Sequence, residues 1–150
     1  MARNNFSLNF DGFMDLAREI DSLGDGYLQK AVENAFTKSK EYVDEEIEDA
    51  MAQSKYNFDK GQGFSQGKIK ASFEEVSKMP IEWNGTTITA PIGVKTSDAL
   101  EILFLIYGSP NTPKDTKLHN AIKVKGKVKK EVERIQEEEF QKVIQEAMNG

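Results

Sequence analysis

The sequence contains no cysteine and a single histidine, His119. The missing thiols exclude disulfides, thiolate metal sites and cysteine nucleophiles. One histidine excludes metal sites built from several imidazoles, and any histidine-based triad would depend on His119 alone. These absences remove most catalytic chemistries before any motif is considered.

Arginine and long apolar runs are also scarce. The three arginines are Arg3, Arg18 and Arg134. No apolar stretch reaches the roughly 18 residues of a membrane span, and the start MARNNFSLNF lacks the apolar stretch of a secretion signal. We therefore expect no membrane partner and assembly in the cytosol.

The length and charge set the class of protein. A chain of 150 residues predicts a single domain over residues 1–150. Its 20 basic and 25 acidic residues give a net charge of −5. This balance indicates a mildly acidic protein and argues against a bulk nucleic-acid binder.

Charges of opposite sign are concentrated in two segments. From Glu33 to Asp59 there are eight acids and three lysines, and from Lys114 to Lys130 there are seven lysines and one acid. Opposite patches on copies of one protein attract, so both segments are candidates for a subunit interface or a DNA-facing surface. The alternative is two solvated faces that never meet. The candidate residues are Lys114, Lys117, Lys123, Lys125, Lys127, Lys129 and Lys130, with Glu41, Asp44, Glu45, Glu48 and Asp49.

Apolar residues at three- and four-residue steps predict three amphipathic helices, at about 11–24, 26–54 and 127–147. The apolar stripe of the second helix is too long for one short helix to cover, so we expect it to pack on a sheet or a neighbouring subunit. That stripe comprises Leu28, Ala31, Val32, Ala35, Phe36, Ser39, Val43, Ile47, Ala50 and Met51. The exposed faces of the last helix are expected to carry Lys129, Lys130, Glu131, Glu133 and Glu137 to Glu139.

Two segments, at about 55–68 and 108–126, are predicted to be mobile loops. Within the first, GQGFSQGK resembles a phosphate-binding loop, but its glycine spacing is one residue too long and Ile69 replaces the magnesium-binding Ser or Thr. We expect both loops to become ordered on assembly, and the first loop offers Gly61, Gly63, Phe64 and Gly67 for this role.

Asn84-Gly85 between two extended runs predicts a β-hairpin. A two-residue turn would pair Trp83 with Thr86 and Ile81 with Ile88, which places the apolar side chains on one face. In this register Pro80 and Pro91 would each block pairing with a further strand. The apolar run at 97–108 that follows is either a buried helix or a strand.

The order of elements predicts an α+β fold. A small antiparallel sheet with a central hairpin is expected to pack against the long helix of the N-terminal half and against the C-terminal helix.

Chemical candidates are few. His119 lies in a lysine-rich segment and is expected to be exposed or locally bonded. The carboxylates Glu45, Glu46, Glu48 and Asp49 are more typical of a solvated helix face than of a cation site. We therefore expect no enzyme, no metal and no cofactor.

Binding of nucleic-acid phosphates by the Lys114–Lys130 segment, beside Tyr107 and Phe64, has more support, although this segment contains no arginine.

The order of elements resembles the tail-component family of long-tailed bacteriophages, the neck or tail-completion proteins of siphophages. Gly67, Ile69 and Ser72 stand where the family has a Gly-x-Leu-x-x-Ser segment, and Tyr107-Gly108 and Ala121 match a later segment. Ile106 replaces the family's acid, and KLHNAI lacks the family's Phe and Pro. The matching stretches are GFMDLAREIDSLG, GFSQGKIKASF and LFLIYGSPNTPKDTKLHNAI.

This resemblance implies a non-enzymatic virion protein that joins head to tail or completes the tail. It implies a ring around the DNA channel, monomers when free, and contacts with head-closure and with tail-terminator or tail-tube proteins. It also implies non-specific contact with passing DNA, and a location in the neck or tail after assembly in the host cytoplasm. The alternative is a small DNA-associated or regulatory protein that binds phosphates through the Lys114–Lys130 segment.

Overall fold

The fold is α+β, as the sequence predicts. The computed structural model describes residues 3–7, 22, 24, 26–53, 68–84, 87–95, 107, 108, 110 and 113–149. Most of the helix expected at 11–24, the loop with Gly61, Gly63, Phe64 and Gly67, and the apolar run up to residue 106 lie outside these residues. The elements are β1 (Arg3–Ser7), α2 (Tyr27–Gln53), α3 (Lys68–Ser77), β2 (Glu82–Asn84), β3 (Thr87–Lys95), α5 (Thr116–Ile122) and α6 (Lys127–Asn149).

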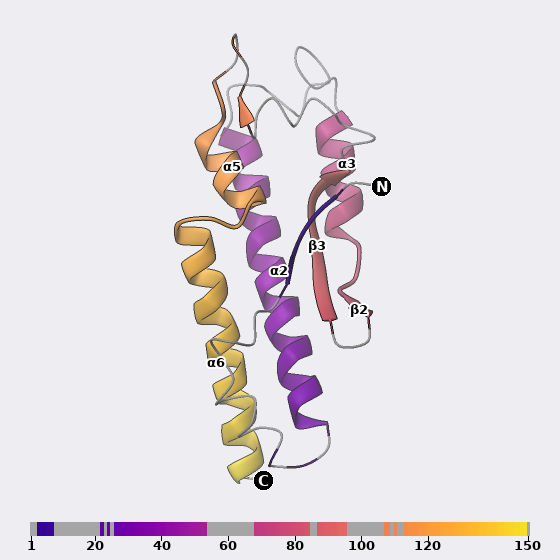
Figure 1. Cartoon of the computed structure of the whole chain (residues 1–150), viewed down its shortest axis with the longest axis vertical. Coiled ribbons are helices and arrows are strands. Elements are labelled where there is room, and N and C mark those ends of the chain that lie inside the picture. The colour runs from indigo at the N-terminus through magenta and orange to yellow at the C-terminus, as the bar shows by residue number, and fades with distance from the viewer. Residues whose placement is uncertain are drawn as a thin grey trace.

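The long helix α2 lies at the centre of the molecule, with α5 and α6 on one side and the sheet and α3 on the other (Figure 1). The boundaries predicted for α2 and α6 are confirmed to within two residues. The predicted stripe of α2 is buried from Ala31 to Met51, with one addition, Lys40. A helix with neighbours on two sides buries a wider apolar face than a surface helix. Because those neighbours cover both halves of α2, its apolar pattern is long as well as wide.

Two short helices were not predicted. The segment after the glycine-rich loop was expected to be extended, but it forms α3, which buries Ile69, Phe73 and Val76 at a helical spacing. The prediction of a loop throughout 108–126 is wrong for residues 116–122, because α5 forms there, whereas residues 123–126 form a turn. Asp115 caps α5 by accepting a hydrogen bond from the Leu118 amide at 3.1 Å. Helices this short give few apolar repeats, so the periodic signal is weak.

The sheet is antiparallel, with the order β1-β3-β2. The β2–β3 hairpin exists, but Trp83 pairs with Ile88, and the predicted pairing with Thr86 is wrong by two residues. A shift of two residues keeps the same side chains on each face, so the apolar pattern does not distinguish the two registers.

The prediction that Pro91 blocks a further strand is also wrong, because Pro91 pairs with Asn5 of β1. Proline removes one donor from the ladder, and the pairs on both sides of it remain. The register shifts by two residues between Arg3 and Asn4, opposite the part of β3 that contains Gly93 and Val94. Gly93 has φ +87°, a conformation that suits a β-bulge and that glycine adopts without a steric penalty.

The core is divided into two hydrophobic clusters along α2. One joins the C-terminal half of α2 to α3, β3, α5 and the start of α6, and the other joins the N-terminal half of α2 to β3 and the end of α6. Residues between these clusters on both helices are buried but polar. We call them the polar layer, and they are Ser39, Lys40, Gln136 and Glu139.

None of the helices in the described part of the chain combines the length and the apolar character required to cross a bilayer.

Candidate functional site

Lys40 of the polar layer connects three elements. Its side chain is only 9% exposed, and its Nζ donates to Asp44 Oδ2 at 3.0 Å, the Pro91 carbonyl at 2.7 Å and the Val76 carbonyl at 3.3 Å. Three acceptors match the three donors of an ammonium group, so the buried charge is fully hydrogen-bonded. Lys40 therefore attaches α2 to the end of α3 and to the central strand.

Asp44 belongs to the same interior contact. Burial raises the pKa of its carboxyl, and the hydrogen bond from Lys40 offsets part of that rise. Its Oδ1 is buried without a hydrogen-bond partner in the described structure. Asp44 was predicted as an interface residue, but in this structure it is largely enclosed and bound to its own chain.

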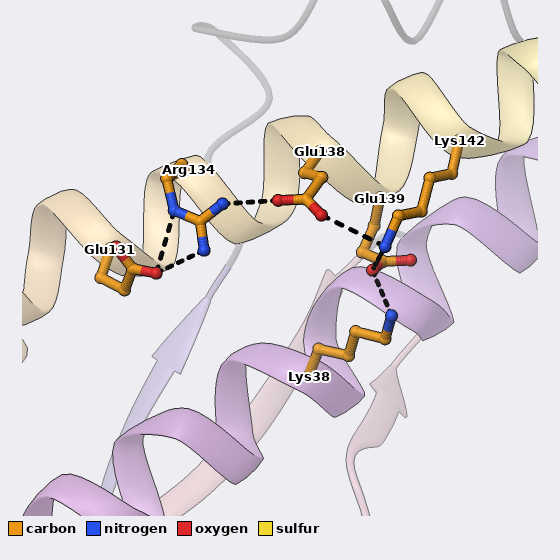
Figure 2. A network of polar contacts seen from close by, with 6 residues as sticks. All are labelled: Lys38, Glu131, Arg134, Glu138, Glu139 and Lys142. Atoms are coloured by element: carbon orange, nitrogen blue, oxygen red, sulfur yellow. Dashed lines mark hydrogen bonds and ion pairs between the residues drawn. The ribbon is translucent and has the colours of Figure 1, made fainter.

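A second network joins α2 to α6 (Figure 2). Glu139 contacts Lys38 of α2 at 2.5 Å and Lys142 at 3.2 Å. Burial by itself would raise the pKa of Glu139, but the two lysines outweigh burial and hold the pKa below its ordinary value. The prediction that Glu139 lies on an exposed face is wrong, because its side chain is 5% exposed.

The other basic side chains of this network, Arg134 and Lys142, also form ion pairs. Arg134 binds Glu131 and Glu138, and Lys142 contacts Glu138 as well as Glu139. These groups line a hollow of about 280 Å³ between α2 and α6, together with Glu41 and Glu45. Because the carboxylates of α6 already bind the cations, Glu41 and Glu45 form no ion pair with any described residue.

Glu41, Glu45 and Glu48 form a single exposed stripe on α2, since they are four and three residues apart. Glu48 also lacks an ion pair within the described ranges. We call these three residues the acidic ridge. They are the members of the predicted acidic set whose carboxylates stay unpaired in the described structure.

Asp49 and Lys117 come from the two oppositely charged segments and meet within one chain. Lys117 Nζ lies 2.6 Å from Asp49 Oδ2 and 2.8 Å from Gln53 Oε1. The hydrogen bond from Lys117 lowers the pKa of Asp49. These two candidate residues therefore already satisfy one another in the monomer.

The other lysines of the basic segment have no such partner. We call them the basic corner: five of them surround the junction of α5 and α6, and Lys114 precedes the start of α5. None of them forms an ion pair with a described carboxylate, and all are exposed except Lys123, which is half-buried. Lys123 Nζ lies 5.0 Å from the ring centre of Tyr107, a cation–π contact, and Tyr107 is 61% exposed. The basic corner consists of Lys114, Lys123, Lys125, Lys127, Lys129 and Lys130.

The backbone of the basic corner is strained. The amide of Lys125 donates to the Asn120 carbonyl at 2.9 Å, and that of Val124 donates to the Ala121 carbonyl at 3.3 Å. This is the Schellman pattern of a helix end, in which glycine or asparagine normally occupies the left-handed position. Here Val124 occupies it with φ +52°, an unfavourable conformation for a β-branched residue, and its side chain packs against the core.

His119 was predicted to be exposed or locally bonded in a loop. It lies instead on α5, is buried, and its ring meets the Tyr107 ring edge-on with centroids 6.5 Å apart. Within the described residues, no three histidine, aspartate or glutamate side chains converge in a way that could hold a metal ion.

Comparison with protein-family models, curated proteins and solved structures finds no match. The function is therefore inferred from the surface chemistry and from the order of elements.

Sequence reasoning missed Lys40 and Glu139 as structural residues. A signal existed for Lys40, because it lies four residues after Phe36 and three before Val43, on the apolar face of α2. Glu139 directly precedes Phe140, which is fully buried, so the edge of the buried face of α6 passes through it.

Proposed function

We propose that this protein is a non-enzymatic structural component of a bacteriophage virion, of the neck or tail-completion type. It would act by forming a ring around the DNA channel and docking to the neighbouring head-closure and tail-terminator or tail-tube proteins. Two lines of support are the order of elements in the sequence and the distribution of charge in the structure.

The observation that carries the proposal is the segregation of the unpaired charges. Among the described residues, the acidic ridge of α2 and the basic corner are groups of three or more like charges that form no ion pair, although Glu74, Glu133, Glu137 and Lys78 are also exposed and form none. A ring built by repeating one contact needs two different, complementary surfaces on each copy. Two surfaces of opposite sign on one chain meet that need.

The proposed location follows from the function. Free chains would be monomeric in the host cytoplasm at ordinary concentrations and would join the neck or tail during assembly, where neighbouring rings raise their local concentration. Passing DNA would contact the ring without sequence reading. The expected ordering of the loop with Gly61, Gly63, Phe64 and Gly67 on assembly stays a prediction.

Mass measurement of the full chain tests the proposal directly. The protein is weighed alone, with purified candidate head rings, and with purified tail tubes. We expect a monomer at low concentration alone and a multimeric complex with at least one of the rings. A chain that ignores both rings under all conditions would contradict the phage role.

A second candidate function rests on the basic corner alone. Six lysines that form no ion pair with a described residue, one of them against the exposed Tyr107 ring, offer a surface that phosphates can bind, as in a small DNA-associated protein. Replacing Lys123, Lys125 and Lys127 by Glu would abolish salt-dependent retention on DNA if this function holds. Equal retention of wild type and variant would exclude it.

A further inference from the structure

We infer that the basic corner of one copy docks on the acidic ridge of the next copy, in a repeated head-to-tail contact. The inference rests on the proposed function, because it names the contact by which that ring would form. The partner surface is thus a second copy of this chain, presenting Glu41, Glu45 and Glu48.

Internal pairing selects these two surfaces. The predicted residues Asp44, Asp49 and Lys117 are bound within the monomer, as are Lys38, Arg134 and Lys142 between α2 and α6. The acidic ridge and the basic corner keep exposed charges with no ion pair to any described residue. Exposed Glu74, Glu133 and Glu137 also form no ion pair with a described residue, but the corner and the ridge each bring three or more such charges of one sign together, which favours attraction between these two surfaces.

The start of α6 independently points to an anionic partner. The amino end of a helix carries partial positive charge, which favours acidic residues in the first turn. The first turn of α6 contains no acid and instead holds Lys127, Lys129 and Lys130. These ammonium groups repel the helix dipole and one another, and carboxylates from outside would relieve both repulsions.

Backbone strain occurs at the same place. Val124, with φ +52°, stands between Lys123 and Lys125 in the turn that leads into α6. Conflicts between local preference and structure concentrate at functional sites, where another interaction compensates for them. The corner therefore combines unfavourable charge placement and unfavourable backbone conformation within a few residues.

The two surfaces also match in extent. Glu41 and Glu48 are seven residues apart on a helix, which spaces the ends of the ridge by about 10 Å. The lysines from Lys123 to Lys130 lie on the connection between α5 and α6 and on the first helical turn of α6, and the length of this stretch is similar to that of the ridge. The contact joins two unlike surfaces, and where each copy uses its corner and its ridge on two different neighbours, the contact is heterologous and its repetition closes a ring or extends a filament.

A charge exchange tests the contact in the full chain. One variant carries Glu41→Lys and Glu45→Lys, which makes the ridge positive, and the other carries Lys125→Glu, Lys127→Glu, Lys129→Glu and Lys130→Glu, which makes the six-residue corner negative. At low ionic strength and high protein concentration, we expect wild type to self-associate in sedimentation velocity and each variant alone to stay monomeric. An equimolar mixture of the variants should recover the wild-type assemblies, since each reversed surface then meets its opposite.

Controls separate the contact from changes in net charge or folding. Glu33→Lys with Glu137→Lys changes the net charge as the ridge variant does, at carboxylates outside both surfaces, and should assemble like wild type. The corner variant should melt about 2 °C higher than wild type, because acids suit the start of α6 and this gain exceeds the cost of like charges near Glu131 and Glu133. Loss of assembly in a more stable variant cannot result from unfolding.

Engineered cysteines give a second readout, because the chain has none of its own. Under mild oxidation, a mixture of Glu45→Cys and Lys129→Cys chains should form a mixed disulfide dimer, and each variant alone should form far less. Efficient dimers of each variant with itself would indicate a symmetric contact and overturn the inference.

Three further outcomes would overturn the inference. They are a wild type that stays monomeric, a mixture that does not recover assembly, and a corner variant that loses DNA retention while self-association persists. The proposed function fails separately, when wild type does not join head or tail rings. A chain that joins those rings with both charge surfaces reversed would keep the function and exclude this contact.

Discussion

In the polar layer, Lys40 and Glu139 are buried and each is bound by at least two partners, whereas the six lysines of the basic corner form no ion pair with any carboxylate that the structure describes. The layer lies between the two core clusters and holds α2 against α3, β3 and α6. The corner lies at a strained helix end and faces outward. The charges in the layer therefore stabilise the fold. In our proposal, the charges in the corner bind a partner.

Replacing Lys40 by Met should give the largest effect on this comparison. The substitution leaves the Asp44 carboxylate and the Val76 and Pro91 carbonyls without their donor, and we expect a loss of about 3 kcal/mol in the free energy of unfolding. Urea denaturation measures it. Lys78→Met, at an exposed lysine, is the matched control and should leave stability unchanged.

The double variant Lys40→Met, Asp44→Asn separates the pair from its surroundings. Removing the charge of Asp44 removes the uncompensated carboxylate, so the double variant should recover part of the loss. A double variant less stable than Lys40→Met alone would show that the two groups do not act as a pair.

Glu139→Gln should give the next largest effect, about 1–2 kcal/mol at neutral pH, since it weakens charge-assisted bonds from Lys38 and Lys142. The folded-state pKa of Glu139 is lowered. Its contribution is therefore complete above the pH where an unfolded glutamate ionises and is lost as the pH falls through the folded pKa.

Chemical denaturation across the acid range measures this dependence. The stability difference between wild type and Glu139→Gln should shrink as the pH falls through the folded pKa. Glu138→Gln, which alters an exposed neighbour in the same network, should change stability much less. A pH-independent difference would show that Glu139 acts through packing and not through its charge.

Two substitutions at Val124 examine the strained corner. Val124→Ala loses core contact but keeps the steric conflict of a side chain at φ +52°, whereas Val124→Gly removes that conflict. We expect Val124→Gly to be more stable than Val124→Ala by about 1 kcal/mol, although glycine is usually the less stable of the two. Thermal unfolding of both variants shows which one is more stable. A more stable Val124→Ala would contradict the inference that the left-handed conformation at position 124 is strained.

The smallest effect compares a paired lysine with an unpaired one in the same segment. Lys117→Gln should lower stability slightly, because it removes the ion pair with Asp49. Lys129→Gln should raise it by about 0.3 kcal/mol, because it removes a positive charge from the start of α6. Matched urea titrations measure the change in the free energy of unfolding for both variants. Changes of opposite sign would support the distinction between the paired lysine and the unpaired lysines of the basic corner, and changes of the same sign would contradict it.

Long periodic helices were predictable from the sequence, and short or tertiary features were not. The stripes of α2 and α6 repeat over many turns, so their bounds were predicted to within two residues. Asn84-Gly85 predicted the hairpin. The predicted and the observed register both place positions 83 and 88 on one face of the sheet, so the apolar pattern cannot distinguish the two registers.

The candidate charges were predicted by segment, but their pairing was not. Asp49 and Lys117 are far apart in the chain, and only the packing of α5 on α2 brings them together. The burial of Glu139 depends in the same way on the packing of α6 on α2. Sequence reasoning therefore found a charge split, and tertiary packing decided which of its members stay unpaired.

The position of β1 has a consequence for synthesis of the chain. Residues 3–7 leave the ribosome well before their partner strand β3, which spans Thr87–Lys95. The first strand must therefore wait, unpaired, until α2, α3 and the hairpin have been translated, and closing that long loop is slow compared with local helix formation. Strand β1 thus completes the sheet late although it is synthesised before β3, so a chaperone that binds β1 would delay the last step of sheet formation.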